Sequence, residues 1–440
     1  MTTSAPHGPE LSRRTLLGLT GGLGAAFALA ACGSNTGRPT TGPAPTGRSS
    51  GVGVTLEQWY HQYGEAGTQQ AVEQYASAYP GAAVNVTWKP GDYDQTVGAT
   101  LLTDGAPDVF EYANGPTIDM IRSGQVVDLT DVFGPALADF NPALIKRLTY
   151  DGKVWAVPQV VDTQLLVYRK SMLNKAGVAP PTTIDELVDA AGRLTSGKVK
   201  GLFLGNDGGA GLMGGPMLRS AGFDYLTDAG TFGFDDPRAA TALGTLRTLF
   251  TSGHLLLGAP VDWFAADALI HGLTAMQFTG LWTFPEIAKA LGDDFGVLPW
   301  PAMTGGAPNV PVGAYGSCVS AHGKNVDAAR EFVKWLWVDS TDKQLDFATG
   351  YGLHIPARQS LAAQATALRQ GPAAEAVTIA QRHGFPQNHL LWTPRSTTAF
   401  NDMMSRIVKD GADPGREITA LKKIVDGQLA DLGRTSPATG

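Results

Sequence analysis

Aromatic and polar side chains follow two segments of strand character in the first part of the chain. Trp59 and His61 end one of these segments, and Tyr112 and Asn114 follow the other. Open α/β sheets bind ligands outside the carboxyl ends of their strands, so we expect these side chains at a binding site. Aromatic rings offer apolar faces, while imidazole and amide groups offer hydrogen bonds. These residue types suit a small polar molecule with apolar faces.

Catalytic motifs are missing from the sequence. It contains no G-x-S-x-G elbow, no Walker A loop and no H-E-x-x-H. The eight histidines are scattered, and His383 with His389 is the nearest approach to a metal-ligand pair. Cys318 lies in an apolar segment at 312–320, so we interpret it as a buried core residue. We therefore predict no catalytic residue, no metal, no cofactor and no enzymatic activity.

One glycine-rich segment imitates a dinucleotide-binding motif. Gly209–Gly214 matches G-x-G-x-x-G after a predicted strand, and Asp235 follows at about the spacing of a ribose-binding acid. Gly215 and Pro216 would fall in the first turns of the helix that the motif requires. We interpret the segment as a loop kept small so that a bulky group can pack against its backbone.

The N-terminus carries export signals. A twin-arginine pair, Arg13-Arg14, opens an apolar and small-residue run over 16–31 that is shorter than the ~20 residues of a membrane-spanning helix. The run ends in Leu29-Ala30-Ala31-Cys32, which is typical of a bacterial lipobox, with an ordinary A-x-A cleavage site as the alternative. We predict a signal peptide over 1–31 and lipidation of Cys32. Twin-arginine and general secretory export both stay open.

A tether follows the predicted anchor. Residues 33–51 are mainly Gly, Pro, Ser and Thr and include no large apolar residue, so they cannot bury enough surface to fold. We therefore assign 32–51 to a lipidated cysteine and flexible tether. The predicted location is the outer face of the bacterial cell membrane.

Length and composition frame the remaining chain. At 440 residues, two or more domains are expected. The net charge of −7 gives no support to nucleic-acid binding. Charged residues make up 17%, below the ~25% of an average domain, and 55 Gly with 28 Pro argue against coiled coils. The two cysteines cannot form a disulfide framework.

Strand and helix signals alternate along the chain. Segments 56–60, 84–88 and 107–110 have strand character, and Thr68 is placed to cap a helix between the first two. Strand–helix–strand order predicts an α/β fold with a mostly parallel sheet.

Similar signals continue in the later chain. Thr183 and Glu186 form a predicted capping box, and 201–204 has the character of a buried strand. Further helices are expected from Asn325 and over about 415–432.

Several spaced segments carry a recognisable pattern: 78–86, 105–109, 150–158, 166–170, 176–187, 272–276, 280–282 and 296–301. Together they resemble a carbohydrate-type extracellular solute-binding lipoprotein of an ABC importer, similar to the maltose-binding protein family. They occur in the family's order and span nearly all of 52–433.

The resemblance implies two α/β lobes joined by three crossovers, with the ligand in the cleft between the lobes. It places the crossovers near 159–163, 312–316 and 355–359. The implied first lobe is 52–161 plus 315–357, and the second is 162–314 plus 358–436.

The resemblance also implies site residues. Trp282 stands where the family stacks its sugar, and Asp162 matches an acidic or amide residue that accepts sugar hydroxyls. Tyr315 lies at the second crossover, where it could stack or donate. Weaker candidates in irregular stretches of the second lobe are Trp263, Trp392 and Arg395.

The function that follows is capture of a mono- or oligosaccharide by lobe closure and delivery to ABC permease subunits, by a monomer anchored through Cys32. Three alternatives stay open. The same fold could bind a polyol, an amino-acid derivative or an anion. An extracytoplasmic glycosidase could use two carboxylates. A sensor or adhesion lipoprotein would bind without transport.

Overall fold

Two large β-sheets and one two-stranded sheet, β4-β5, organise residues 53–313 and 315–434, the part of the chain that this computed structural model describes. The first sheet has the strand order β2-β1-β3-β12-β6, and the second has the order β14-β11-β7-β9-β8, with β10 and β13 also paired to β7. The strands are β1 (Thr55–His61), β2 (Ala83–Lys89), β3 (Val109–Ala113), β4 (Thr149–Tyr150), β5 (Lys153–Val154), β6 (Val157–Pro158), β7 (Val160–Arg169), β8 (Lys200–Phe203), β9 (Thr274–Gly280), β10 (Phe295–Leu298), β11 (Val310–Gly313), β12 (Tyr315–Val319), β13 (Ile355–Pro356) and β14 (Gly384–Pro386).

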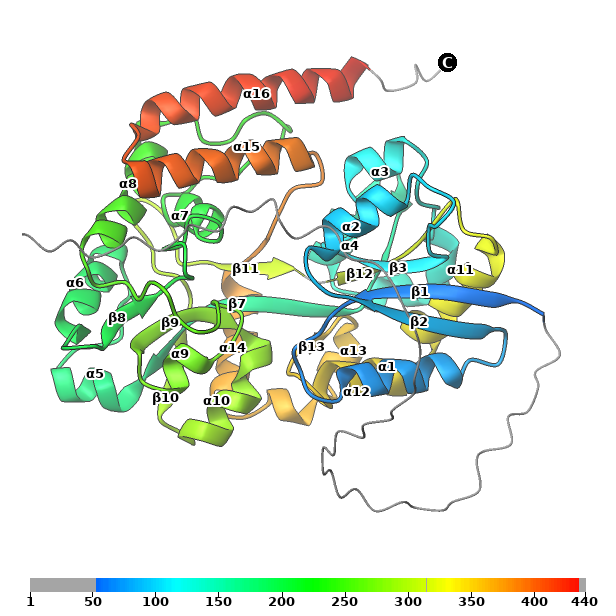
Figure 1. Cartoon of the computed structure of the whole chain (residues 1–440), viewed down its shortest axis with the longest axis horizontal. Helices are drawn as coiled ribbons and strands as arrows, with labels where there is room; N and C mark the ends of the chain where they lie inside the picture. The colour runs from blue at the N-terminus through cyan, green and yellow to red at the C-terminus, as the bar shows by residue number, and fades with distance from the viewer. Residues whose placement is uncertain (1–52, 314, 435–440) are drawn as a thin grey trace, which may run out of the picture. The chain divides into compact units, whose positions relative to one another are not determined.

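Helices cover both sheets (Figure 1). They are α1 (Thr68–Ser77), α2 (Tyr93–Thr100), α3 (Ile118–Arg122), α4 (Pro142–Leu148), α5 (Lys170–Ala176), α6 (Ile184–Leu194), α7 (Gly214–Ser220), α8 (Pro237–Thr251), α9 (Asp267–Ile270), α10 (Phe284–Leu291), α11 (Val326–Lys334), α12 (Thr341–Thr349), α13 (Gln359–Ala362), α14 (Gly371–His383), α15 (Pro394–Ser405) and α16 (Pro414–Arg434). The predicted α/β class is confirmed. None of the helices in the described residues is long and apolar enough to cross a membrane.

The first sheet belongs to one lobe with a single hydrophobic core. Alternate residues of β1, such as Leu56 and Tyr60, are buried in it, together with α1 and α11. The helix expected after the first strand is α1, but Thr68 is its first helical residue rather than its cap. Gly67 holds the cap position with a φ of 98°, a left-handed conformation that glycine adopts without steric cost.

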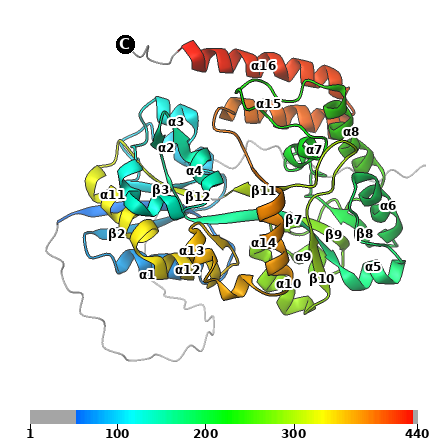
Figure 2. The ribbon, with the colours of Figure 1, turned by 180° about the vertical axis from the view of Figure 1, so that it is seen from behind.

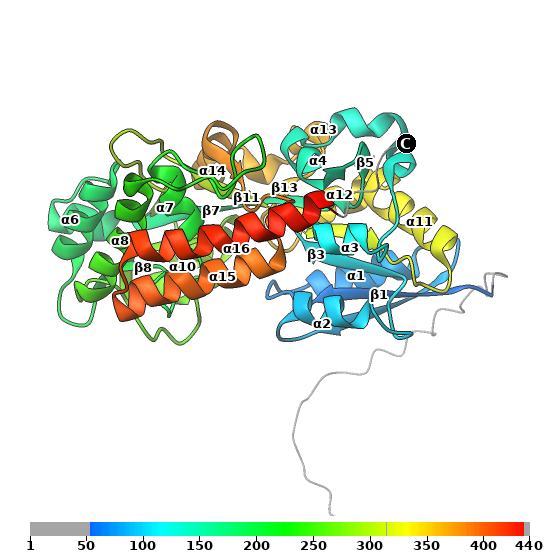
Figure 3. The same cartoon turned by 90° about the horizontal axis from the view of Figure 1, so that it is seen from above.

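The second sheet is buried on both faces, with a separate core on each. Along β7 the side chain of Leu166 joins the core with α6, α8 and α16, while Leu165 and Val167 join the core with α10 and α14. This is the period of two that a strand imposes. Figure 2 shows α14 against this sheet, and Figure 3 shows α15 and α16 running side by side. The predicted capping box of Thr183 and Glu186 starts α6.

Three short stretches connect the lobes. The chain passes from β6 of the first sheet to β7 of the second at Pro158–Val160 and returns between β11 and β12 at Gly313–Tyr315. It reaches the second sheet again at β13, which pairs with the start of β7. In Figure 1, β11 points toward β12, whereas β7, which is antiparallel to β11, begins beside the first lobe and runs away from it. The residue limits of the two lobes stay a prediction.

The prediction of a mostly parallel sheet holds for the three strands from which it was made, since β1 pairs in parallel with β2 and with β3, but it is wrong for the two sheets as a whole. Four pairings are parallel: β1 with β2, β1 with β3, β8 with β9 and β11 with β14. By contrast, β7 and β12 run antiparallel to every strand that pairs with them. The strand–helix–strand rule governs strands that one crossover helix connects. Strands that arrive from the other lobe have no such connection, so their direction is free.

The glycine-rich segment Gly209–Gly214 leads into α7, which has only seven residues. A Cβ on Gly214 would stand 2.4 Å from the ring of Phe400, and one on Gly215 would stand 2.8 Å from the hydroxyl of Tyr225. The bulky groups against this backbone are therefore the protein's own aromatic side chains.

Candidate ligand-binding site

A cavity of about 1040 Å³ lies where β1, β3 and β9 end and where β7 begins. We call it the cleft. Its lining comes from both lobes, and its volume lies at the upper end of the range for small-molecule sites. The lining includes His61, Tyr63, Glu65, Asn114, Asp162, Gln164, Trp263, Phe264, Asp267, Trp282, Glu286, Lys289, Gly313, Tyr315, Tyr351, His354 and Gln387.

Three aromatic side chains form one wall of the cleft. Trp263 and Trp282 meet edge to face, with ring centroids 6.0 Å apart. The Nε1–H of Trp282 donates to the carbonyl oxygen of Phe264 at 2.9 Å. Phe264 keeps 55% of its surface exposed, which is unusual for so large an apolar residue. These rings offer apolar area to a ligand while the polar atom of Trp282 is already satisfied.

Gly280 determines where the Trp282 ring lies. The ring folds back over the end of β9, and a Cβ on Gly280 would stand only 1.9 Å from Cζ3 of Trp282. No other residue type leaves room for this position without moving the ring. The hydrogen bond to Phe264 then fixes the orientation of the indole.

The opposite wall is a hydrogen-bonded cluster around Glu111, which is 1% exposed. One carboxylate oxygen accepts from the backbone N–H of His61 at 2.8 Å and pairs with the imidazole Nδ1 of the same residue. The other oxygen accepts from the hydroxyl of Tyr63 at 2.8 Å. The ring of Tyr315 stacks on His61 at 4.2 Å, with 14° between the planes. The cluster therefore presents two rings whose positions are fixed.

Glu111 also sets the charge of His61. Burial alone would lower the pKa of His61, but the negative charge of Glu111 and its hydrogen bond outweigh burial. Glu65 and Asp94 act in the same direction, so the pKa of His61 lies above its ordinary value.

A second buried histidine joins two acidic residues at the rim of the crossovers. His354 Nδ1 lies 2.5 Å from Asp162 Oδ1, and its Nε2 lies 3.8 Å from Glu65 Oε1. Asp162 belongs to β7, whereas Glu65 belongs to the loop after β1. Burial would lower the pKa of His354, but the charge and hydrogen bond of Asp162, followed by the charge of Glu65, raise it above the ordinary value.

Amide side chains approach the cleft beside the second crossover. Asn114 has a φ of 60°, a left-handed conformation that asparagine tolerates better than most residues. A Cβ on Gly313 would stand 2.4 Å from Oδ1 of Asn114 and 2.6 Å from Oε1 of Gln387, so glycine lets both amides approach the backbone. The Oε1 of Gln164, on β7, is buried and has no partner among the described residues. These groups suit recognition of hydroxyls.

The structure brings together five of the eight binding residues expected from the sequence: His61, Asn114, Asp162, Trp282 and Tyr315 all line the cleft. The weaker candidate Trp263 also lines it. Their contact with a ligand stays a prediction. Cys32, the signal peptide and the tether lie outside the described residues.

The other three expected residues do not line the cleft. Trp59 lies under the ammonium of Lys89, 3.7 Å from the ring centroid. It shares a side of β1 with His61 but stands two residues before the strand end, which is where the cleft begins. Tyr112 lies within β3 rather than after it, on the same side as Phe110. Arg395 is exposed in the first turn of α15. The expected strand over 107–110 ends three residues before β3 does, and this produced the error for Tyr112.

Trp392, the other weak candidate, is buried in the second-lobe core at 6% exposure. It packs against Tyr225 and borders a small side cavity rather than the cleft.

Sequence reasoning missed several lining residues, among them Glu65, Tyr63, Phe264, His354 and Gln387. Most lie in loops without a strand or helix signal. Of these residues, His354 had the clearest signal in the sequence, because it directly precedes the expected third crossover. Within residues 53–313 and 315–434, no three His, Cys, Asp or Glu side chains gather into a group fit to hold a metal ion.

Comparisons with known proteins place the cleft in context. A family model described as bacterial extracellular solute-binding protein matches residues 59–337. The diacetylchitobiose-binding protein DasA of Streptomyces coelicolor is 27% identical over 84% of this chain and 88% of its own. A galactooligosaccharide-binding protein of Bacillus subtilis is 22% identical over 92% of this chain and 94% of its own.

Solved structures share the fold. The GacH receptor of Streptomyces glaucescens, determined unliganded and with acarbose, superposes with a TM-score of 0.72 at 24% identity and covers 86% of this chain and 98% of its own. A maltose-bound MalE3 of T. maritima superposes with a TM-score of 0.70 at 20% identity and covers 85% of this chain and 99% of its own. The predicted two-lobed binding-protein fold is confirmed.

The pairing of His354 predicts a pH-dependent stability. The folded-state pKa of His354 lies above 6.5, so its contribution to the free energy of unfolding is complete below that pH. This contribution is lost as pH rises through the raised pKa. We expect the stability difference between the wild-type chain and His354→Gln to be larger near about pH 6 than near about pH 9. Urea denaturation across this range measures it.

His271→Gln is the matched control, because His271 is exposed and its imidazole bonds to the carbonyl oxygen of Asp267 rather than to a carboxylate. We expect no pH-dependent stability difference for this variant. A His354→Gln difference that stays constant across the range would contradict the assigned ion pair.

Proposed function

Because the chain belongs to the bacterial extracellular solute-binding protein family, we propose that it captures a mono- or oligosaccharide and delivers it to an ABC permease. Proteins of this family are extracellular, so the chain acts outside the cytoplasm. The curated relatives that bind diacetylchitobiose and galactooligosaccharide support a carbohydrate as the class of ligand.

The observation that carries this proposal is the pairing of two unlike walls. The second lobe offers the rings of Trp263, Phe264 and Trp282, while the first lobe offers the fixed His61–Tyr315 stack. A pyranose has an apolar C–H face that suits an aromatic ring and a rim of hydroxyls that needs polar partners. The amides of Asn114, Gln164 and Gln387 are suited to that rim.

The proposed mechanism has two states. A sugar in the open protein meets one wall, whereas in the closed protein it meets both, so it binds the closed state more tightly. That difference in affinity shifts the population toward closure. The closed form then docks on the permease. We propose that the protein acts as a monomer, with lobes bounded at 52–161 plus 315–357 and 162–314 plus 358–436.

We propose binding without catalysis. Asp162 is engaged by His354, and Glu111 is engaged by His61 and Tyr63, so these carboxylates hold the site together. A glycosidase would need one carboxylic acid and one carboxylate free to act on the scissile bond. The rival enzyme is tested by the same sugars that test binding.

We also propose that the mature chain begins at Cys32, carries lipid there, and is tethered by residues 33–51 after a signal peptide over 1–31. The small residues before Cys32 and the absence of large apolar residues after it support this arrangement.

A thermal-shift screen against mono- and oligosaccharides tests the function. A ligand that binds only the folded protein raises its melting temperature. We expect a rise with at least one sugar and no breakdown product by chromatography after prolonged incubation. A rise only with polyols or amino-acid derivatives would change the cargo, and accumulating product would establish the glycosidase.

Trp282 is the sharpest test of the site. We expect Trp282→Ala to weaken binding of the identified sugar by about 2–4 kcal/mol, the range of a buried aromatic hot spot. Gly280→Ala keeps the indole but displaces it, so it should also weaken binding. Isothermal titration calorimetry measures both.

Trp335→Ala is the control for this test, because Trp335 is half-buried and lines none of the cavities described for residues 53–313 and 315–434. It should leave the sugar affinity unchanged. Unchanged affinity in Trp282→Ala would refute the site.

Anchoring is tested in cells. We expect the wild-type chain in the membrane fraction and Cys32→Ser in the soluble extracytoplasmic fraction, because the variant has no thiol to carry lipid. Fractionation with an antibody against the folded part measures this. The Cys318→Ser variant is the control, since Cys318 is buried in β12 and should not affect partition.

A further inference from the structure

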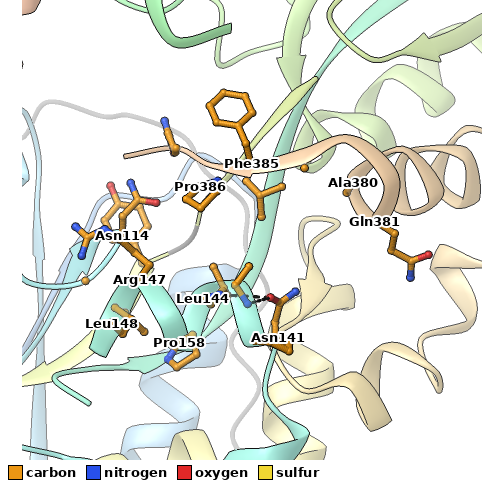
Figure 4. A pocket seen from close by; sticks show the side chains of 18 residues that line it. Asn114, Asn141, Leu144, Arg147, Leu148, Pro158, Ala380, Gln381, Phe385 and Pro386 are labelled. Atoms are coloured by element: carbon orange, nitrogen blue, oxygen red, sulfur yellow. Dashed lines mark hydrogen bonds between the residues drawn. The ribbon is translucent and has the colours of Figure 1, made fainter. Parts of the chain in front are cut away.

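A second cavity lies beside the crossovers and is separate from the aromatic wall of the cleft. It has a volume of about 370 Å³ and is bordered by α4, by the end of α14, by β14 and by the start of β12. We call it the crossover cavity. Figure 4 shows Arg147 and Asn114 at one side of it, with Leu144, Pro386 and Phe385 along its length. Asn114, Tyr315 and Gln387 line both cavities.

Arg147 brings a positive charge to the crossover cavity without a counter-charge. Its Nε–H donates to Oδ1 of Asn388 at 2.7 Å. Its Nη1 is completely shielded from solvent and has no hydrogen-bond partner among the described residues. None of the ion pairs between described residues includes Arg147. Burial lowers the pKa of Arg147 to about 10, so the guanidinium is still charged at neutral pH.

Arg147 as a whole is half-buried, but the shielded part of its guanidinium is costly. A buried charge is normally paired, because loss of hydration is compensated only by an opposite charge and well-placed hydrogen bonds. A guanidinium has five N–H donors in a fixed plane, and they match a carboxylate in a bidentate way. Asn388 uses the Nε–H and Nη1 is shielded from solvent, so Nη2 is the donor group left to meet a ligand at the cavity that Arg147 lines.

The remaining walls of the crossover cavity are mostly apolar, and they indicate what the uncharged part of a ligand would be. Apolar side chains of Leu144, Leu148, Val312 and Phe385 line the cavity, and a few amides, such as Asn141 and Gln381, stand at its border. A cavity with apolar walls and one charged anchor fits a molecule with an apolar body and one anionic end.

We propose that the crossover cavity is a second ligand site, which binds a small organic carboxylate through Arg147 and an apolar body between α4 and β14. This site is distinct from the cleft proposed for the sugar, although the two cavities share part of their lining. It uses none of the aromatic wall of Trp263, Phe264 and Trp282.

The location of the site gives it an effect on the cleft. Its walls come from α4, β6 and β12 on one side and from α14, β11 and β14 on the other. A ligand that contacts both sides binds best at one spacing of the two lobes. Binding at the two sites is then coupled, and the coupling is reciprocal.

Phenylacetate is a suitable probe, with phenylacetamide as its neutral counterpart. We expect millimolar phenylacetate to raise the melting temperature of the full chain and phenylacetamide to have a much smaller effect. Arg147→Met should raise the dissociation constant for phenylacetate about tenfold or more, because a charge-assisted hydrogen bond is lost. Arg147→Lys keeps the charge without the planar guanidinium. Its dissociation constant for phenylacetate should therefore lie between those of the wild-type chain and Arg147→Met.

Two further variants keep the test decisive. Ala380→Phe fills the cavity from α14 and leaves Arg147 in place. It should therefore abolish the rise in melting temperature that phenylacetate causes. Trp282→Ala should retain it, because phenylacetate does not use the cleft. The proposal is overturned if phenylacetate has no effect on the wild-type chain, if Arg147→Met responds equally, or if Trp282→Ala loses the response. Failure of the sugar screen would leave these outcomes unaffected.

Discussion

The backbone pairing at the start of β7 is the interaction on which the cleft depends. Val160 and Val161 pair with β13, and Asp162 and Thr163 pair with β11, so all three crossovers meet within a few residues. These hydrogen bonds hold the connecting strands in one register and place Asp162 and Gln164 at the bottom of the cleft. Because the period of a strand is two, a slip of one residue would turn both side chains away from it.

The acidic side chains around the start of β7 are neutralised by paired histidines rather than by contact with solvent. Glu111 and Asp162 each have a histidine against them, and in both cases the carboxylate outweighs burial and raises the pKa of the imidazole. The carboxylate of Glu111 and the imidazole of His354 are thereby satisfied before any ligand arrives. A site whose groups are already oriented loses less entropy on binding, which is the usual advantage of preorganisation. Arg147 is the exception, since no acidic side chain plays the same part for it.

Much of the fold could be predicted from local chemistry. The Thr183–Glu186 capping box and the buried segment around Cys318 have signals contained within a few residues, and both predictions hold. Strand direction could not be predicted in the same way, because it depends on which lobe a strand arrives from. For the site, Trp282 was found through its resemblance to a family position, whereas His354 gains its partners only through contacts with Glu65 and Asp162, far away in the sequence.

The indole of Trp282 has one hydrogen-bond donor, and the carbonyl of Phe264 already occupies it. The ring can therefore contribute contact area to a ligand but cannot read the direction in which a hydroxyl points. In the site that we propose, the amide groups of Asn114, Gln164 and Gln387 are the ones placed to discriminate between epimers. Evolution could thus exchange these few side chains and redirect the protein to a sugar of different stereochemistry, while the aromatic platform and the glycine beneath it stay as they are.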